Sequence, residues 1–115
     1  MEQRFEVVFH INDASPHKQR GTLKNISNLL AESPDIRVEL VVQGDAITLV
    51  TAQESPFANA LAALQQRGVV IAVCRNTLKA KGMTDTELLD DMTIVPSAVG
   101  ELVRRQQQGA AYIKP

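Results

Sequence analysis

The sequence predicts an α/β fold, a three-layer sandwich in which helices cover both faces of a parallel sheet. Segments with the apolar pattern of strands alternate along the whole chain with segments that have helical spacing. Parallel strands need crossover connections, which are usually helices, and these are right-handed. A flavodoxin-like or Rossmann-like arrangement is therefore the simplest topology. The 115 residues fit a single domain, residues 1–115.

Five segments have the composition of strands. Residues 4–11 and 36–42 alternate apolar and polar side chains over much of their length. Residues 69–73 are a continuous apolar run, whose length suits a strand buried on both faces. Residues 92–95 and 110–114 supply two shorter strands.

Two longer helices are predicted from their start and stop signals. Ser15 followed by Pro16 provides a side-chain cap and a proline at the first helical position. Gly21 weakens the early part of this helix and so leaves room for an irregular first turn or a later start. The pair Ser55–Pro56 repeats the cap-and-proline signal, and Gly68 ends that second helix.

The remaining helical segments are several short stretches and a last helix. Residues 78–81 form a short basic helix, and Thr84 with Glu87 matches a capping box. Residues 46–51 are ambiguous, but their place after a strand and a turn favours a short helix over a strand. Ser97 is read as the cap of the last helix. That helix is expected to turn Ala98, Val99, Leu102 and Val103 inward and Arg104, Arg105 and Gln107 outward.

Composition excludes several classes of function. The net charge of −1 gives no general attraction to nucleic acid or to an anionic membrane, and three phenylalanines and one tyrosine are too few for a base-stacking platform. One cysteine excludes an internal disulfide and a cysteine-only metal site. The glycine-rich phosphate loops are missing, which leaves a nucleotide-binding regulator as the least supported class. We expect neither a metal nor a cofactor.

The N-terminal stretch and the cysteine count together predict the compartment. Residues 1–9 carry two glutamates and lack a long apolar stretch, so they resemble neither a signal peptide nor a membrane span. A single cysteine suits a reducing environment. The expected location is the cytoplasm.

Cys74 is the principal candidate for chemistry. It follows the central strand directly, and reactive groups in open α/β sheets gather beyond the carboxyl ends of strands. Arg75 and Lys79 are close cations, and a helix that starts near Asn76 would point free N–H groups at the thiol. Both effects favour the thiolate. The alternative is that Cys74 is a small buried hydrophobe, which is the common role of an isolated cysteine after an apolar run.

Polar side chains near two strand ends are candidates for the same pocket. His10 ends the first strand and Asn12 follows it, so both reach the pocket if the first and third strands are adjacent. For His10 a hydrogen-bonded role at the edge of the core is equally well supported. Arg75, Asn76 and Thr77 would stabilise an anionic sulfur through charge and hydrogen-bond donors.

Several motifs in the right order indicate a family. They are Leu23–Leu30 (LKNISNLL), Val73–Leu78 (VCRNTL), Ile94–Leu102 (IVPSAVGEL) and Gln106–Pro115 (QQQGAAYIKP). Together they resemble the DsrE/DsrF-like family, and the resemblance covers nearly the whole chain. It implies a mostly parallel five-stranded sheet and assembly into trimers or hexamers. It also implies persulfide transport on a cysteine, which is the role of better-understood members in sulfur oxidation and tRNA thiolation; here that cysteine would be Cys74.

Two hypotheses of function follow. In the first, the protein is a sulfurtransferase-like carrier that moves persulfide sulfur on Cys74 between donor and acceptor proteins. In the second, it is a non-catalytic oligomeric module whose pocket binds a small anion or metabolite. A homo-oligomer is expected in both, because the last helix and strand are apolar; the alternative is a monomer that packs this surface internally.

Overall fold

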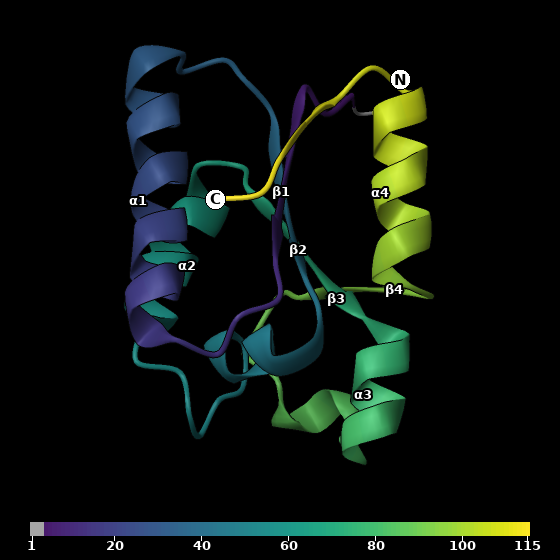
Figure 1. Ribbon diagram of the computed structural model, residues 1–115. Coiled ribbons are helices and arrows are strands. Elements are labelled where there is room, and N and C mark those ends of the chain that lie inside the picture. The colour runs from purple at the N-terminus through teal and green to yellow at the C-terminus, as the bar shows by residue number, and fades with distance from the viewer. Residues whose placement is uncertain (1–3) are drawn as a thin grey trace.

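The computed structural model describes residues 4–115 and contains a five-stranded parallel sheet between two layers of helices (Figure 1). The strand order is β4-β3-β2-β1-β5. The elements are β1 (Val7–Ile11), α1 (Pro16–Glu32), β2 (Val38–Val42), the 3-10 helix η1 (Gly44–Leu49), α2 (Ala58–Gln66), β3 (Val70–Cys74), α3 (Arg75–Lys81), the 3-10 helix η2 (Asp85–Glu87), β4 (Thr93–Val95), α4 (Ala98–Gln107) and β5 (Ala111–Ile113). The predicted fold class is confirmed. Residues 1–3, part of the stretch considered for a leader, lie outside the described residues.

The order of the strands explains how the helices are distributed. The chain steps from β1 to β4 in one direction and then returns to place β5 beside β1. Because crossovers are right-handed, reversing the direction moves the connecting helix to the other face of the sheet. Accordingly, α1 and α2 cover one face and α4 covers the opposite one (Figure 1).

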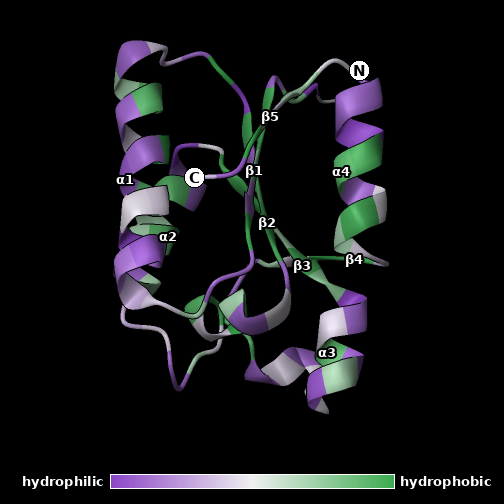
Figure 2. Ribbon diagram, in the orientation of Figure 1, coloured by the Kyte–Doolittle hydropathy of each residue, from purple (hydrophilic) through white to green (hydrophobic). Residues whose placement is uncertain are grey.

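The sheet separates a large core from a small one. The large core lies beneath α1, α2 and η1, and the hydropathy colours show its strands as almost uniformly apolar (Figure 2). The small core lies beneath α4 and includes Cys74 together with seven apolar neighbours. These are Val8, Val41, Ala72, Val95, Ala98, Leu102 and Ala110. Every residue of β1 and β2 is buried, as expected of parallel strands covered on both faces.

Local signals place most element boundaries within a few residues. Ser15 caps α1 by accepting a hydrogen bond from the Lys18 N–H, and the helix begins at Pro16 and passes through Gly21 without a break. Neither the irregular first turn nor the later start that Gly21 left open occurs. Residues 44–49 form a 3-10 helix, which confirms the helical interpretation of that segment.

Two helix predictions needed correction. The second helix begins at Ala58 and not at Pro56, because Ser55 accepts a hydrogen bond from the Phe57 N–H and forms a turn first. The capping box at Thr84 is present, but its helix is a single 3-10 turn. The chain then becomes extended at Leu88, which pairs with Thr51.

The inward face of α4 also differs from the prediction. Ala98 and Leu102 are buried, but Val99 and Val103 are 62% and 48% exposed. Glu101 is buried in their place, and Arg105 turns toward the sheet. The cause lies on β2, where the buried carboxyl of Glu39 requires polar partners from the helix above it.

Candidate functional site

The carboxyl ends of β2, β3 and β4 meet at a pocket of about 480 Å³. After β2 the chain enters η1, which packs in the large core, whereas after β3 it enters α3, on the α4 side of the sheet (Figure 1). Neighbouring strands whose connections diverge in this way open a crevice between them. The pocket is lined by Gln43, Gly44, Cys74, Asn76, Thr77, Ala80, Ser97, Ala98 and Val99.

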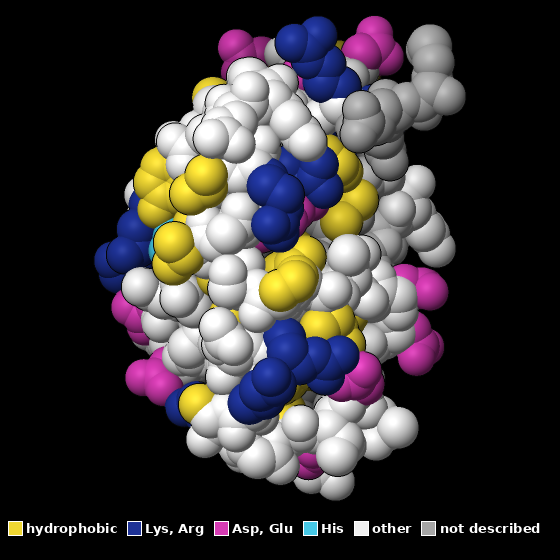
Figure 3. All heavy atoms as spheres, turned by 90° about the vertical axis from the view of Figure 1, so that its right-hand side faces the viewer, with side chains coloured by type: hydrophobic (Ala, Val, Ile, Leu, Met, Phe, Trp, Pro, Cys, Tyr) yellow, Lys and Arg dark blue, Asp and Glu magenta, His cyan; other side chains and the backbone are white. Residues whose placement is uncertain are grey.

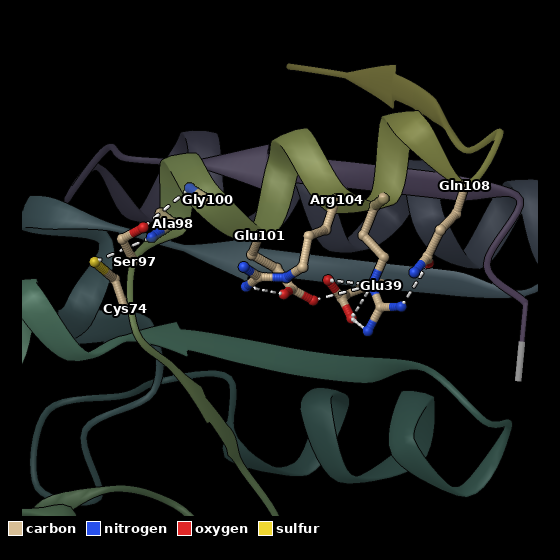
Figure 4. A network of polar contacts seen from close by, with 9 residues as sticks. Glu39, Cys74, Ser97, Ala98, Gly100, Glu101, Arg104 and Gln108 are labelled. Carbon is tan, nitrogen blue, oxygen red and sulfur yellow. Dashed lines mark hydrogen bonds and ion pairs between the residues drawn. The ribbon is translucent and has the colours of Figure 1, made fainter. Parts of the chain in front are cut away.

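Cys74 forms part of the inner wall of this pocket. It is the last residue of β3 and the N-cap of α3. Its Sγ accepts a hydrogen bond from the backbone N–H of Ala98, with 3.3 Å between nitrogen and sulfur (Figure 4). The side chain is only 3% exposed, so a reaction partner must reach it through the pocket.

Hydrogen-bond donors make the thiol more acidic in spite of its burial. Burial raises the pKa of Cys74, but the Thr77 hydroxyl and the N–H groups of Thr77, Ala98 and Asn76 lower it by more. The pKa of the thiol therefore lies below its ordinary value, and the thiolate is favoured. The Thr77 oxygen accepts a hydrogen bond from the Gly44 N–H at 2.9 Å, which leaves the hydroxyl proton free for the sulfur.

The structure brings some of the predicted site residues together and separates others. Cys74, Asn76 and Thr77 share the pocket. The guanidinium of Arg75 lies outside the pocket lining, where it donates to both carboxylate oxygens of Asp85 at 2.6 and 3.1 Å.

His10 and Asn12 line a different hollow of about 130 Å³ beyond β1. The first and third strands are not adjacent, because β2 lies between them. Asp13, Lys18 and Lys114 also border this hollow, so it has charged side chains of both signs, whereas the Cys74 pocket is lined by none.

Sequence reasoning missed the part of the pocket contributed by the end of β2. Gln43 and Gly44 lie in the turn that follows β2, and both line the pocket. The rule that drew attention to Cys74, that strand carboxyl ends converge, also applied to them. Ser97 is a helix cap as predicted, accepting from the Gly100 N–H at 3.0 Å, and it also lines the pocket (Figure 4).

A second polar cluster lies under the middle of α4. Arg105 Nε donates to Glu101 at 2.9 Å and to Glu39 at 3.2 Å, and Arg104 pairs with Glu101 at 2.8 Å (Figure 4). Burial, together with a hydrogen bond to Glu101 and its negative charge, raises the pKa of Glu39 to about 8. Glu39 therefore retains a proton at neutral pH and shares it with the Glu101 carboxylate.

The described residues limit the other kinds of site. Across residues 4–115 there is no group of three or more histidine, cysteine, aspartate or glutamate side chains placed to hold a metal ion. No helix in that range combines the length and the apolar character needed to cross a membrane.

The chain is a five-stranded parallel sandwich with one cysteine at the carboxyl end of β3, the neighbour of the central strand β2. The chain belongs to the DsrE/DsrF-like family, whose model matches residues 6–115. A solved protein of unknown function, MTH1491 from Methanobacterium thermoautotrophicum, is 34% identical with a TM-score of 0.91; the match covers 96% of this chain and 99% of that one.

A more distant structure, the ychN protein from E. coli, shows the same fold. It is 17% identical with a TM-score of 0.83, and the match again covers 96% of this chain and 99% of that one. None of the curated proteins matches this chain.

Proposed function

We propose that the protein is a sulfur-relay carrier that holds persulfide sulfur on Cys74 between a donor and an acceptor thiol. The observation that carries the proposal is a thiol with a lowered pKa at the wall of an open pocket, within hydrogen-bonding distance of the N-terminus of α4. Membership in the DsrE/DsrF-like family is consistent with sulfur relay at the level of the family.

The proposed chemistry is two successive thiol exchanges without net oxidation. The Cys74 thiolate attacks the outer sulfur of a donor persulfide, R–S–SH. The donor S–S bond breaks, R–S⁻ leaves with the bonding electrons, and Cys74–S–SH forms. An acceptor thiolate then attacks that outer sulfur, which yields the acceptor persulfide and restores the Cys74 thiolate. In this scheme the protein carries the sulfur but is not itself consumed.

The pocket supports different roles for the residues around the sulfur. Asn76 and Thr77 are placed to stabilise the negative charge on Cys74. Arg75 is engaged by Asp85, and His10 and Asn12 border another hollow. We therefore assign the direct stabilisation of sulfur to the first two residues.

The test is intact mass after incubation with cysteine persulfide, followed by treatment with a reductant. The wild-type protein should gain one sulfur atom at Cys74 and lose it on reduction, whereas Cys74→Ser should gain none. Loading of the serine variant to the same extent would contradict the assignment, provided that both proteins give the same circular dichroism spectrum.

The nearly complete burial of Cys74 favours a second candidate, the binding module. At 3% exposure, the thiol could be a wall of a pocket that holds a small anion or metabolite. The rate of alkylation distinguishes the two functions. Slow alkylation, with a pH–rate midpoint at the pKa of an ordinary thiol, would support the binding module. Fast alkylation at neutral pH would support the carrier.

We also propose a homo-oligomer, a trimer or hexamer, located in the cytoplasm. Val99 and Val103 of α4 are exposed, as are Tyr112 and Ile113 of the edge strand β5. Figure 3 views the α4 side, where apolar side chains lie between those of lysine and arginine. The free cysteine suits a reducing compartment. Light scattering of the purified protein tests the mass of the assembly.

A further inference from the structure

A hydrogen-bonded chain of side chains leads from β5 across β1 to the Cys74 pocket. The hydroxyl of Tyr112 lies 2.8 Å from His10 Nδ1, and His10 Nε2 lies 2.8 Å from the side-chain oxygen of Gln43. Gln43 follows β2 and lines the pocket beside Cys74. His10, which belongs to another hollow, thus reaches the Cys74 pocket through one intermediate residue.

The partners of His10 fix the orientation of the Gln43 amide. Because an amide oxygen only accepts, His10 Nε2 carries the proton and donates to it. The other nitrogen, Nδ1, then accepts from the Tyr112 hydroxyl. With its oxygen directed at His10, Gln43 turns its NH₂ group away from His10. Among the described residues no buried side-chain nitrogen lacks a partner, so the amide nitrogen of the half-buried Gln43 is open to a ligand or to solvent.

The pocket needs a donor of this kind when the cysteine carries a persulfide. The Thr77 hydroxyl and the Ala98 N–H both act on the inner sulfur, Sγ. An outer sulfur would extend beyond them into the pocket, whose described lining contains no charged side chain. Its polar side chains besides Cys74 and Thr77 are Gln43, Asn76 and Ser97. The Ser97 oxygen accepts from the Gly100 N–H, so its hydroxyl still has a proton to donate. Gln43 is the donor whose orientation other side chains set.

We propose that Gln43, oriented by His10 and Tyr112, donates its amide N–H to the outer sulfur of the Cys74 persulfide and so stabilises its anionic form. This inference rests on the proposed carrier function. In this arrangement the free thiol and the persulfide depend on different residues. Thr77 and Ala98 set the acidity of the thiol, and Gln43 determines how well the outer sulfur is held. His10 and Tyr112 are positioning residues that act through Gln43.

The experiment compares free and persulfidated forms of the full chain. Each variant is treated with cysteine persulfide, and occupancy is read by intact mass; alkylation by iodoacetamide is then followed against pH for both forms. Gln43→Met keeps the size of the side chain but removes its donors. It should lower persulfide occupancy by about tenfold to a hundredfold, the range for a hydrogen bond to a charged group. The substitution should also move the midpoint of the pH–rate profile of the persulfide to higher pH. The midpoint for the free thiol should stay where it is in the wild type.

Variants of His10 test the positioning role. His10→Leu should reproduce the effect of Gln43→Met, and His10→Gln, whose amide N–H can again donate to the Gln43 oxygen, should restore most of the occupancy. Gln66→Met, an exposed substitution on α2 at the opposite face, is the matched control. Melting temperatures confirm that each variant is folded.

Each outcome bears on a distinct claim. If wild-type protein takes up no sulfur, the carrier function and this inference both fail. If it loads and Gln43→Met loads and alkylates identically, the role of Gln43 is overturned while the carrier function stands. If only the His10 variants are without effect, the orienting part of the inference is overturned.

Discussion

At the scale of the residue, Cys74 shows two opposing effects on one thiol. Burial disfavours the charged form, and donors from α3 and α4 favour it. The donors prevail because they come from two helix starts that converge on the carboxyl end of β3, each with N–H groups free of helical partners. The reactivity of the thiol therefore depends on the relative placement of these elements.

We predict that Thr77→Val slows alkylation of Cys74. Valine has nearly the same shape but lacks the hydroxyl that lowers the pKa of the thiol, so the midpoint of the pH–rate profile should move to higher pH. At pH 7 the iodoacetamide rate should fall by about threefold or more, the effect of losing one hydrogen bond. Thr77→Ser keeps the hydroxyl and should behave as wild type. Equal profiles for the valine and serine variants would show that the hydroxyl does not act on the sulfur.

Gly44 and Gly82 offer a matched pair for a second prediction. Both have positive φ, 60° and 65°, and both have open space where a Cβ would be added. Replacing either with alanine should cost about 1–2 kcal/mol of stability, because an L-residue is strained in this conformation. Only Gly44 donates its N–H to Thr77.

The alanine variants should therefore differ in thiol chemistry and agree in stability. Gly44→Ala is expected to slow alkylation of Cys74, and Gly82→Ala is expected to leave it unchanged. Urea unfolding measures the stability and iodoacetamide kinetics the reactivity. Similar alkylation rates for the two variants would mean that the hydrogen bond from the Gly44 N–H to the Thr77 oxygen does not affect the reactivity of Cys74.

At the scale of the element, α4 is held on the sheet by a buried carboxyl pair. Glu39 projects from β2 in the middle of the sheet, and Glu101 and Arg105 reach it from the helix (Figure 4). The Arg105 guanidinium also stacks on Phe5, 4.5 Å from the ring centre. Arg105 contacts both carboxyl groups and Arg104 pairs with Glu101 alone, so Glu39 has no cation of its own and the arrangement is stable while Glu39 keeps its proton.

The raised pKa of Glu39 gives stability a defined pH dependence. The folded value is about 8 and the ordinary value is 4.5. Below pH 4.5 the residue is protonated in both states and its contribution is fully present. Between 4.5 and 8 the folded state binds more protons than the unfolded state, so the free energy of unfolding falls as pH rises. The expected loss across this window is at most about 5 kcal/mol. Glu101, whose pKa is lowered, acts in the opposite sense but below pH 4.5.

We predict that Glu39→Gln removes this decline. Glutamine is neutral at all pH values and can still donate to Glu101 and accept from Arg105. Urea unfolding at pH 5, 6.5 and 8 should give a nearly flat stability for the variant and a falling one for the wild type. The exposed Glu54→Gln is the control and should follow the wild type. If the free energy of unfolding fell in parallel for Glu39→Gln and the wild type as pH rises, a group other than Glu39 would hold the proton responsible.

At the scale of the whole molecule, the two faces of the sheet are covered unequally. The helices α1 and α2, together with η1, cover the large core, whereas α4 lies over the smaller core. Exposed apolar side chains on α4 and on the edge strand β5 extend that face toward solvent. Such a surface is typical of an interface between subunits.

We predict that Val99→Asp with Val103→Asp dissociates the assembly. The two charges would be buried without partners in an interface, which is unfavourable. Light scattering should report an oligomer for the wild type and a monomer for the double variant. Because both side chains are exposed in the monomer, its melting temperature should change little. Gln107→Asp controls for added charge on α4. A wild-type mass equal to one chain would exclude this interface.

The sequence by itself determined the order of the elements and most of their ends. Apolar periodicity, caps such as Ser15 and Ser97, and the capping box at Thr84 act over a few residues, so their effect can be recognised without knowledge of distant contacts. The same local logic placed Cys74 at the end of a buried strand. The family motifs strengthened the prediction of the sheet.

Only the tertiary structure decided which side chains meet. The position of β2 between β1 and β3 separated His10 from the Cys74 pocket and brought Gln43 to it. The buried carboxyl of Glu39 turned Glu101 and Arg105 inward and left Val99 exposed. These outcomes depend on the lateral order of strands and on polar groups that must be paired across distant parts of the chain. Local patterns carry no information about either.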